Sequence, residues 1–253
     1  MDSAKQVTNL NKMPDTGRHS GGQELIWDYF QNEAPESFEG SSARLRFIAD
    51  RIRQPARVLN IGCGTGIFER LALSRGHDVH SLDPSDKSIQ QLRSRLNLGE
   101  KAKTGYIQNI PFPDAAFDVV VVSEVLEHLT PEITRLGLAD IRRVLKPGGR
   151  IIGTVPSRED LRQQAVVCPC CGKKFHRWGH EQSFDGPGMR ALLSEFFIVT
   201  RMVERPFVPW RTLNSKGRTI ATMKMVLWRL GSHGSNENIF FEATRSDNGR
   251  GAP

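Results

Sequence analysis

Three glycines and one aspartate have the types and spacing of a nucleoside-binding site. Gly62, Gly64 and Gly66 occupy alternate positions after the expected strand at residues 57–61. Glycine permits a sharp turn and a close approach of ligand to backbone, and free amides at the next helix start can meet a polar ligand group. Asp83 lies at the end of the next expected strand, where it can accept hydrogen bonds from ribose hydroxyls or cap a helix. The spacing differs from the dinucleotide G-x-G-x-x-G pattern, so we expect a ligand with a ribose and a non-phosphate polar end.

Two carboxylates and an imidazole form a second candidate site. Glu124, Glu127 and His128 follow the apolar run at residues 117–122. Catalytic residues collect beyond the carboxyl ends of strands in α/β sheets. The three side chains could hold a hard cation, Mg²⁺ or Mn²⁺, which would acidify a substrate hydroxyl. Alternatively, His128 acts as a general base beside Glu124 without a metal, or simply packs against its neighbours.

The third cluster has the spacing C-x₂-C-x₄-H-x₃-H. Cys168, Cys171, His176 and His180 lie within thirteen residues and resemble a zinc knuckle in which histidine replaces the last cysteine. A closed zinc site of structural type would order a polar loop that has little apolar content. The alternatives are that Cys170 is a ligand, that the cysteines bind no metal, or that His180 belongs to the active site instead.

Alternating strands and helices must position these residues. The expected strands cover residues 57–61, 77–82, 117–122 and 150–155, and the helices between them cover 66–75, 85–96 and 131–145. This alternation predicts an α/β fold with a doubly wound, mostly parallel sheet. The rhythm stops at about 157–185 and resumes with a helix at 188–195 and strands at 196–203 and 238–244. We therefore predict a polar arm at residues 1–20 and one domain at 21–253 with a short Cys/His-rich loop insertion.

Composition limits the class of protein. Charged residues make up 25% of the 253 residues, and the net charge is +7 with a pI of about 9.5. Residues 201–230 contain seven Lys or Arg and one acidic residue, so most of the excess is local. We find no apolar run of membrane-spanning length and no secretory signal, and we predict a cytoplasmic protein that can be membrane-peripheral.

The motifs together resemble those of class I S-adenosylmethionine-dependent methyltransferases, in the broad group that includes ubiquinone-pathway O-methyltransferases. The similarity covers roughly residues 40–245 and rests on five motifs. They are the glycine loop, Asp83, the run Ile110-Pro-Phe-Pro-Asp-Ala-Ala-Phe-Asp118, the run Ser123-Glu-Val-Leu-Glu-His-Leu129, and Leu145-Lys-Pro-Gly-Gly149. The resemblance implies a Rossmann-like fold with seven strands.

The resemblance also implies roles for particular residues. Asn60, Gly62, Cys63 and Gly64 would hold the amino-acid part of S-adenosylmethionine and Asp83 its ribose. Gln108, Asn109 and Ile110 would flank the adenine, and Ser123 would lie at the mouth of the site. Many relatives have an aspartate four residues before the Ile-Pro-Phe turn; here that residue is Tyr106, and the amide of Asn109 or a backbone carbonyl would replace it.

The segment with Glu124, Glu127 and His128 is similar to the metal-binding segment of ubiquinone-pathway O-methyltransferases and of small-RNA 3′-terminal 2′-O-methyltransferases. In the latter, a further histidine comes from the segment after the following strand. His176 or His180 could match it.

The acceptor is the least defined part of the prediction. Apolar residues of the basic stretch 219–230 share one helical face, which indicates either packing on the sheet or contact with an anionic membrane. We predict O-methylation of a small, sugar-linked or lipid-linked hydroxyl. The alternative is an RNA-binding protein or RNA methyltransferase, in which Trp178, Trp210 and nearby arginines contact RNA.

Overall fold

The computed structural model describes residues 20–34, 40–53, 55–210, 212–231 and 237–246. The predicted arm at residues 1–20 therefore lies outside the described residues, apart from Ser20. Seven strands form the central sheet in the order β3-β2-β1-β4-β5-β9-β8. They are β1 (Arg57–Ile61), β2 (Asp78–Asp83), β3 (Ala102–Thr104), β4 (Phe117–Ser123), β5 (Leu145–Pro156), β8 (Ile198–Pro206) and β9 (Glu237–Thr244). The first five pair in parallel, and β9 is antiparallel to β5 and β8, which confirms the predicted mostly parallel sheet.

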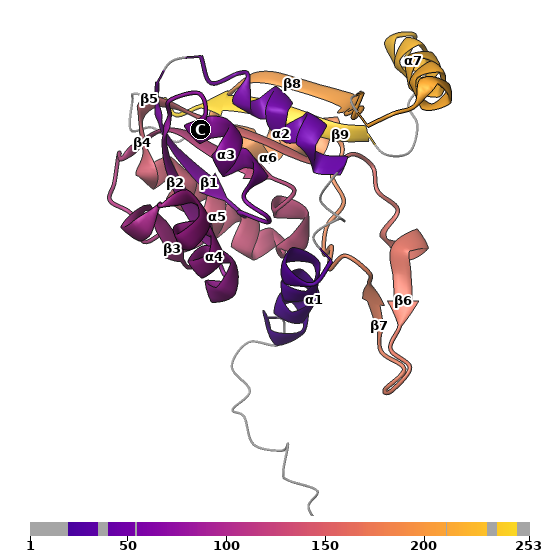
Figure 1. The fold of residues 1–253 in the computed structure, drawn as a ribbon, viewed down its shortest axis with the longest axis horizontal. Helices are drawn as coiled ribbons and strands as arrows, with labels where there is room; N and C mark the ends of the chain where they lie inside the picture. Colours follow the sequence, from indigo (N-terminus) through magenta and orange to yellow (C-terminus); the bar gives the residue numbers. More distant parts are fainter. Residues whose placement is uncertain (1–19, 35–39, 54, 211, 232–236, 247–253) are drawn as a thin grey trace, which may run out of the picture.

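Helices cover both faces of this sheet (Figure 1). They are α1 (Ser20–Asn32), α2 (Ser42–Ala49), α3 (Ile67–Leu73), α4 (Asp86–Leu96), α5 (Pro131–Val144), α6 (Gly186–Ser194) and α7 (Ser215–Arg229). Val119 and Val121 of β4 pack in the core beneath α2 and α3, while Val120 and Val122 pack in the core beneath α5 and α6. Because both faces of β4 are covered, its central residues 119–122 are an unbroken run of valines.

The main elements agree with the sequence prediction to within a few residues, and the differences are short. Strand β3 has only three residues, too few to show an alternating pattern. Among the described residues, the short 3₁₀ helices η2 (Gly99–Lys101), η3 (Leu126–His128) and η4 (Leu161–Gln164) were also not predicted.

The Cys/His-rich segment forms a hairpin, although the sequence predicts no regular element there. Strands β6 (Ala165–Val167) and β7 (Lys174–His176) pair in antiparallel, with Val167 opposite Lys174 and Ala165 opposite His176. The hairpin projects from the body of the molecule (Figure 1). Its cysteines therefore lie toward the tip, and His176 lies at the base.

Helix α7 lies apart from the sheet at the end of β8 (Figure 1). Of its side chains only Ala221 is buried, and Trp228 donates its Nε1 hydrogen to the carbonyl oxygen of Glu204 at 2.7 Å. The predicted apolar face points outward; Ile220, Met223, Val226, Leu227 and Leu230 are 47–77% exposed. The expectation that this face packs on the sheet is therefore wrong. None of the described helices is both long and apolar enough to span a bilayer.

Candidate functional site

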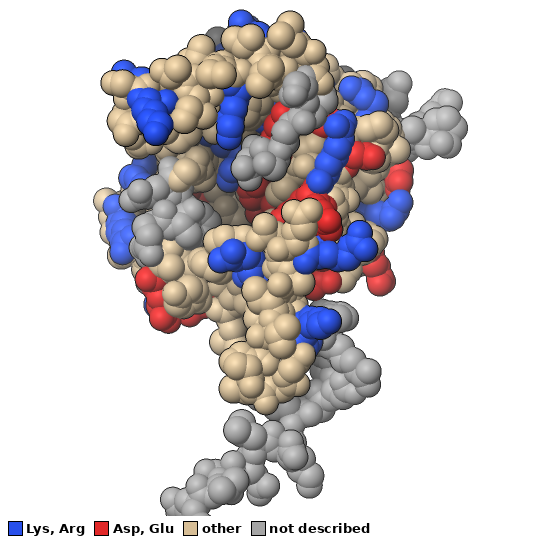
Figure 2. All heavy atoms as spheres, turned by 90° about the vertical axis from the view of Figure 1, so that its right-hand side faces the viewer, with Lys and Arg blue, Asp and Glu red and all other residues tan. Residues whose placement is uncertain are grey.

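A cavity of about 1020 Å³ opens at the carboxyl ends of β1, β2 and β4. The loop after β1 and the segment after β4 form two of its walls, and residues Trp27, Phe30 and Gln31 of α1 cover it. Figure 2 shows acidic side chains inside a hollow of the face that also bears the hairpin, with Lys and Arg around it. Ligands of open α/β sheets bind beyond the carboxyl ends of the strands, so this cavity is the candidate active site.

The glycine loop has no room for side chains at two of its positions. Gly62 has φ +82°, and a Cβ there would lie 2.6 Å from Cγ2 of Val125. Gly66 has φ +75°, and its Cβ would lie 2.7 Å from Cδ1 of Leu92. Only glycine combines this backbone conformation with such close contacts. The loop consequently presents bare backbone to the cavity.

Asp83 holds the glycine loop from beneath. Its Oδ2 accepts a hydrogen bond from the backbone N–H of Cys63, and its Oδ1 accepts one from Ser85, both at 2.9 Å. The carboxylate is 1% exposed, and burial raises its pKa above the usual value. Asp83 lines the cavity. Each carboxylate oxygen has a second lone pair, so the group could bind a ligand hydroxyl in addition to the loop.

Glu69 is a buried carboxyl that the sequence analysis missed. Its Oε1 accepts hydrogen bonds from Nδ2 of Asn60 at 2.7 Å and from the hydroxyl of Ser81 at 2.9 Å. Burial raises its pKa to about 7. The side-chain amide of Asn60 is therefore engaged below the cavity. The sequence could have indicated it, because the spacing of Glu69 and Ala72 places this glutamate on the buried face of α3.

The structure brings most of the predicted cofactor residues to the cavity. Those that line it are Asn60, Gly62, Cys63, Gly64, Asp83, Gln108 and Ser123. Asn109 and Ile110 do not line it. Asn109 pairs with Tyr106 in an isolated bridge, and Ile110 is buried in the core with its N–H donated to Asp140. Their place beside the adenine stays a prediction.

Glu124 occupies a strained position directly after β4. Its φ is +56°, in the left-handed region that a non-glycine residue rarely adopts. Its carboxylate accepts hydrogen bonds from Nδ2 of Asn238 at 3.0 and 3.1 Å and lies 3.8 Å from the guanidinium of Arg44. Glu124 lines the cavity, but it does not belong to the cluster described next. Its role as a cation ligand beside Glu127 and His128 stays a prediction.

Glu127, His128 and His180 offer ligand atoms within 4.8 Å of one another. Glu127 is 1% exposed, and neither carboxylate oxygen has a hydrogen-bond partner. Burial and the nearby Glu124 raise its pKa well above its usual value. A buried carboxylate without a partner is costly, and a cation would satisfy it. His180, one of the histidines that the sequence singled out, is thus brought to the acidic segment.

His128 is neutral in this environment. Burial and the neighbouring His180 lower its pKa to about 3. Its Nδ1 lies 3.2 Å from Nε1 of Trp27 and 3.2 Å from the carbonyl oxygen of Gly179. One nitrogen cannot accept from the first and donate to the second at the same time. Donation to Gly179 leaves Nε2 unprotonated, and this tautomer can accept a proton or bind a cation.

The predicted zinc knuckle is not assembled. Cys168 and Cys171 lie at the hairpin tip, where the N–H groups of Cys168 and Gly172 close the turn. His176 and His180 instead meet Glu159, which the sequence analysis did not single out. Of the described residues, no cysteine belongs to a group of three or more that could hold a metal ion. The register of the hairpin separates the two halves of the predicted ligand set.

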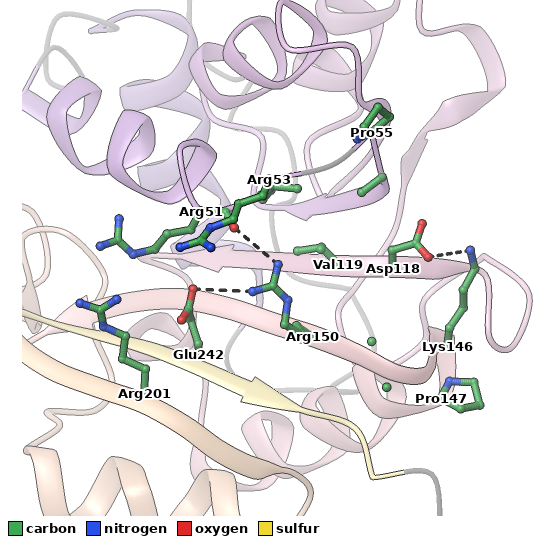
Figure 3. A pocket seen from close by; sticks show the side chains of 14 residues that line it. Arg51, Arg53, Pro55, Asp118, Val119, Lys146, Pro147, Arg150, Arg201 and Glu242 are labelled. Carbon is green, nitrogen blue, oxygen red and sulfur yellow. Dashed lines mark hydrogen bonds and ion pairs between the residues drawn. The ribbon is translucent and has the colours of Figure 1, made fainter.

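A second hollow, of about 620 Å³, lies at the amino ends of β1 and β4 (Figure 3). Lys146 pairs with Asp118 at 2.7 Å, and Arg150 lies 4.0 Å from Glu242. Arg51 and Arg201 add further positive charge. This second hollow contains none of the predicted site residues, and it lies at the edge of the sheet opposite the glycine loop. It is therefore not the candidate active site.

Comparison with known proteins finds a family match for part of the chain. Residues 59–153 match the family described as "Methyltransferase domain". A malonyl-[acyl-carrier protein] O-methyltransferase of Erwinia pyrifoliae is 34% identical over 117 residues, which are 46% of this chain and 44% of that protein. The O-methyltransferase rstn1 of Aspergillus nomiae is 32% identical over 135 residues, 49% of this chain and 58% of that protein. The chain thus spans about half the length of these relatives.

A solved structure extends the likeness over nearly the whole fold. The Burkholderia thailandensis 1,6-didemethyltoxoflavin-N1-methyltransferase, determined with bound 1,6-didemethyltoxoflavin and S-adenosylhomocysteine, superimposes with a TM-score of 0.63. The match covers 93% of both chains at 18% identity. At this identity the likeness concerns the fold alone.

Proposed function

Because this chain carries a class I S-adenosylmethionine-dependent methyltransferase domain, we propose that it methylates a hydroxyl group of a small, sugar-linked or lipid-linked acceptor. One observation carries the proposal. The cavity is lined by a bare glycine loop with Asp83 and by His128 and His180, which form a cluster with the buried Glu127. The names of the two curated relatives, both O-methyltransferases, support oxygen as the acceptor atom.

The glycine loop and Asp83 fit S-adenosylmethionine. Gly62 lines the cavity with backbone alone, in a left-handed conformation, and Asp83 can accept from ribose hydroxyls. We assign the amino-acid part of the cofactor to Gly62, Cys63 and Gly64. Gln108 would lie at the adenine, and Ser123 at the mouth. Asn60 would act indirectly, since its amide is held by Glu69.

When bound, the cofactor supplies an activated methyl group, whose transfer to an acceptor oxygen leaves S-adenosylhomocysteine and releases the hydroxyl proton. His128 would take this proton on Nε2, because burial keeps the ring neutral and Gly179 can hold the proton on Nδ1. Helix α1 would exclude water, since Trp27 and Phe30 cover the cavity. Glu124 would not react. Its contacts with Arg44 and Asn238 would stabilise that wall of the cavity.

A divalent cation of the Mg²⁺ or Mn²⁺ type fits the same cluster. The unpartnered oxygens of buried Glu127 support this, as do the two imidazoles beside it. Glu127, His128 and His180 would hold the ion, which would acidify the acceptor hydroxyl. His128 would then be a ligand and not the base. Both roles need Nε2 of His128 unprotonated.

The exposed face of α7 supports a lipid-linked acceptor. Four exposed cations, Lys216, Arg218, Lys224 and Arg229, accompany the outward apolar residues, and the helix has no acidic residue. Such a helix fits an anionic membrane surface, where apolar side chains enter the lipid and cations meet headgroups.

Methyl transfer from labelled cofactor to a cell extract tests the proposal. We expect label in a low-molecular-weight or organic-solvent fraction, lost in the Asp83→Ala variant. Label in RNA would instead favour the RNA methyltransferase. No transfer to any fraction, by protein that binds S-adenosylhomocysteine, would contradict the proposed activity.

A further inference from the structure

Three side chains, His176, Glu159 and His180, lie in a row that runs from the base of the hairpin to the cavity. Glu159 lies between the two rings: Nε2 of His176 is 3.4 Å from its Oε1, and Nδ1 of His180 is 2.5 Å from its Oε2. The two rings stack with centroids 4.5 Å apart. Neither His176 nor Glu159 has a role in the proposed reaction.

The tautomer of His176 follows from its backbone contacts. Its Nδ1 accepts hydrogen bonds from the backbone N–H of Trp178 at 3.3 Å and of His180 at 3.1 Å. A ring nitrogen that accepts has no proton, so Nε2 of His176 carries the proton. Nε2 is buried and makes no hydrogen bond, and Oε1 of Glu159 lies 3.4 Å from it. The N–H of His176 therefore faces the Glu159 carboxylate, and a protonated Nε2 is unsuited as a metal ligand.

Glu159 determines which nitrogen of His180 carries the proton. The Glu159 carboxyl lies between the two rings, with nitrogen–oxygen distances of 3.4 and 2.5 Å, and a glutamate is ionised at neutral pH. An ionised carboxylate only accepts hydrogen bonds, and Nδ1 of His180 must donate. In the neutral ring the lone pair then lies on Nε2. This is the nitrogen left for Glu127 and His128, whose ligand atoms lie within 4.8 Å.

We propose that Glu159 and His176 are positioning residues that fix His180 as the Nδ1–H tautomer and direct its unprotonated Nε2 at Glu127 and His128. The cation at that cluster rests on the proposed function; the tautomer of His180 does not. Carboxylates that accept the second ring N–H of a metal-binding histidine serve this purpose in known sites. In this arrangement, His180 is a ligand, whereas Glu159 and His176 act through it.

In the Glu159→Gln variant, we expect His180 to adopt the opposite tautomer. The amide keeps an acceptor for the Nε2–H of His176, which its two backbone hydrogen bonds hold in place. The amide NH₂ then faces Nδ1 of His180, which must accept, so the proton of His180 moves to Nε2. His176→Gln, which retains an N–H donor, is the matched control and should leave His180 unchanged.

Long-range ¹H–¹⁵N correlation spectra of histidine-labelled full-length protein measure the tautomer directly. We expect Nδ1–H for His180 in the native protein and Nε2–H in Glu159→Gln. Nε2–H in the native protein, or no change in the variant, would overturn the proposal. A loss of packing alone would not invert the tautomer.

Calorimetry with Mn²⁺ tests the positioning role separately from the presence of a cation. It also distinguishes this role from one in which Glu159 and His176 bind the ion themselves. We expect Glu159→Gln to weaken Mn²⁺ roughly 10- to 100-fold, His176→Gln to have a small effect, and S-adenosylhomocysteine affinity to persist in both. If His176→Gln abolishes Mn²⁺ binding as His180→Ala does, the ion sits at Glu159 and His176, and the positioning role is wrong. A native protein that binds no Mn²⁺ but has the Nδ1–H tautomer would contradict the cation and support the positioning role.

Discussion

The indole Nε1 of Trp27 lies 3.2 Å from Nδ1 of His128, and the two rings meet edge to face with centroids 5.4 Å apart. This contact joins α1 to the segment after β4 across 101 residues of sequence. The hydrogen bond from Trp27 also disfavours the tautomer of His128 that the proposed reaction needs. Donation from Trp27 to Nδ1 would place the proton of His128 on Nε2. Donation from Nδ1 to Gly179 instead leaves Nε2 unprotonated.

Trp27→Phe should therefore favour the active tautomer. Phenylalanine keeps an aromatic ring over His128 but has no N–H donor, so Nδ1–H can donate to Gly179 without competition. A hydrogen bond of about 0.5–1.5 kcal/mol is removed from the inactive form. We expect Mn²⁺ affinity by calorimetry to rise about 2- to 10-fold. A fall in affinity would show that the Trp27 hydrogen bond supports the site.

Glu69 should make stability depend on pH. Its folded pKa of about 7 exceeds the usual 4.5 of an unfolded glutamate, so the folded state binds more protons between these values. Its favourable contribution is complete below the lower value and is lost as pH rises through about 7, at a cost on the order of 3 kcal/mol. Glu69→Gln keeps both hydrogen bonds to Oε1 and avoids this cost.

Urea unfolding at several pH values between 4.5 and 8 measures the effect. The free energy of unfolding of Glu69→Gln relative to the native protein should increase with pH. A difference that stays constant over this range would mean that Glu69 is not protonated in the folded state near neutral pH.

His128 should be essential to turnover in either proposed role. His128→Ala removes both the base and a cation ligand, and we expect a loss of about 10²–10⁴-fold in turnover with S-adenosylhomocysteine binding retained. EDTA separates the roles. Activity that EDTA removes and Mn²⁺ restores indicates the cation, and activity that EDTA leaves intact indicates the base. Full activity of His128→Ala would eliminate both.

Helix α7 should bind anionic vesicles. Flotation with phosphatidylglycerol-containing vesicles should recover the protein, and pure phosphatidylcholine vesicles should recover less, because each cation near an anionic surface contributes about 1 kcal/mol. Leu227→Ser should weaken binding roughly tenfold. Leu136→Ser is the matched control, since Leu136 of α5 is also 50% exposed. Equal loss in both variants, or equal binding to both vesicle types, would argue against this surface.

The sequence predicted the parts of the molecule that local patterns determine. The apolar run at residues 117–122 is strand β4 because both its faces are covered, and Gly62 and Gly66 adopt the left-handed conformations that their spacing suggested. Asp83 lines the same cavity because adjacent parallel strands end at one edge of the sheet.

Contacts between distant segments could not be predicted in this way. The hairpin register decides that His176 and His180 meet Glu159 and not the cysteines, and no local pattern sets that register. Glu124 turns toward Asn238, 114 residues away, and so leaves the cluster of Glu127. The sequence could not decide between packing on the sheet and exposure for the apolar face of α7, because an amphipathic pattern shows that a face is apolar but not what covers it.

Calorimetric titration of S-adenosylhomocysteine is the most direct test of the assignment of the cavity to S-adenosylmethionine. We expect the native protein to bind it in the micromolar range, about −8 kcal/mol. Asp83→Ala should weaken binding by roughly 1.5–3 kcal/mol, because charge-assisted hydrogen bonds to the ribose are lost. Absence of binding by the native protein, or unchanged affinity in Asp83→Ala, would contradict the assignment.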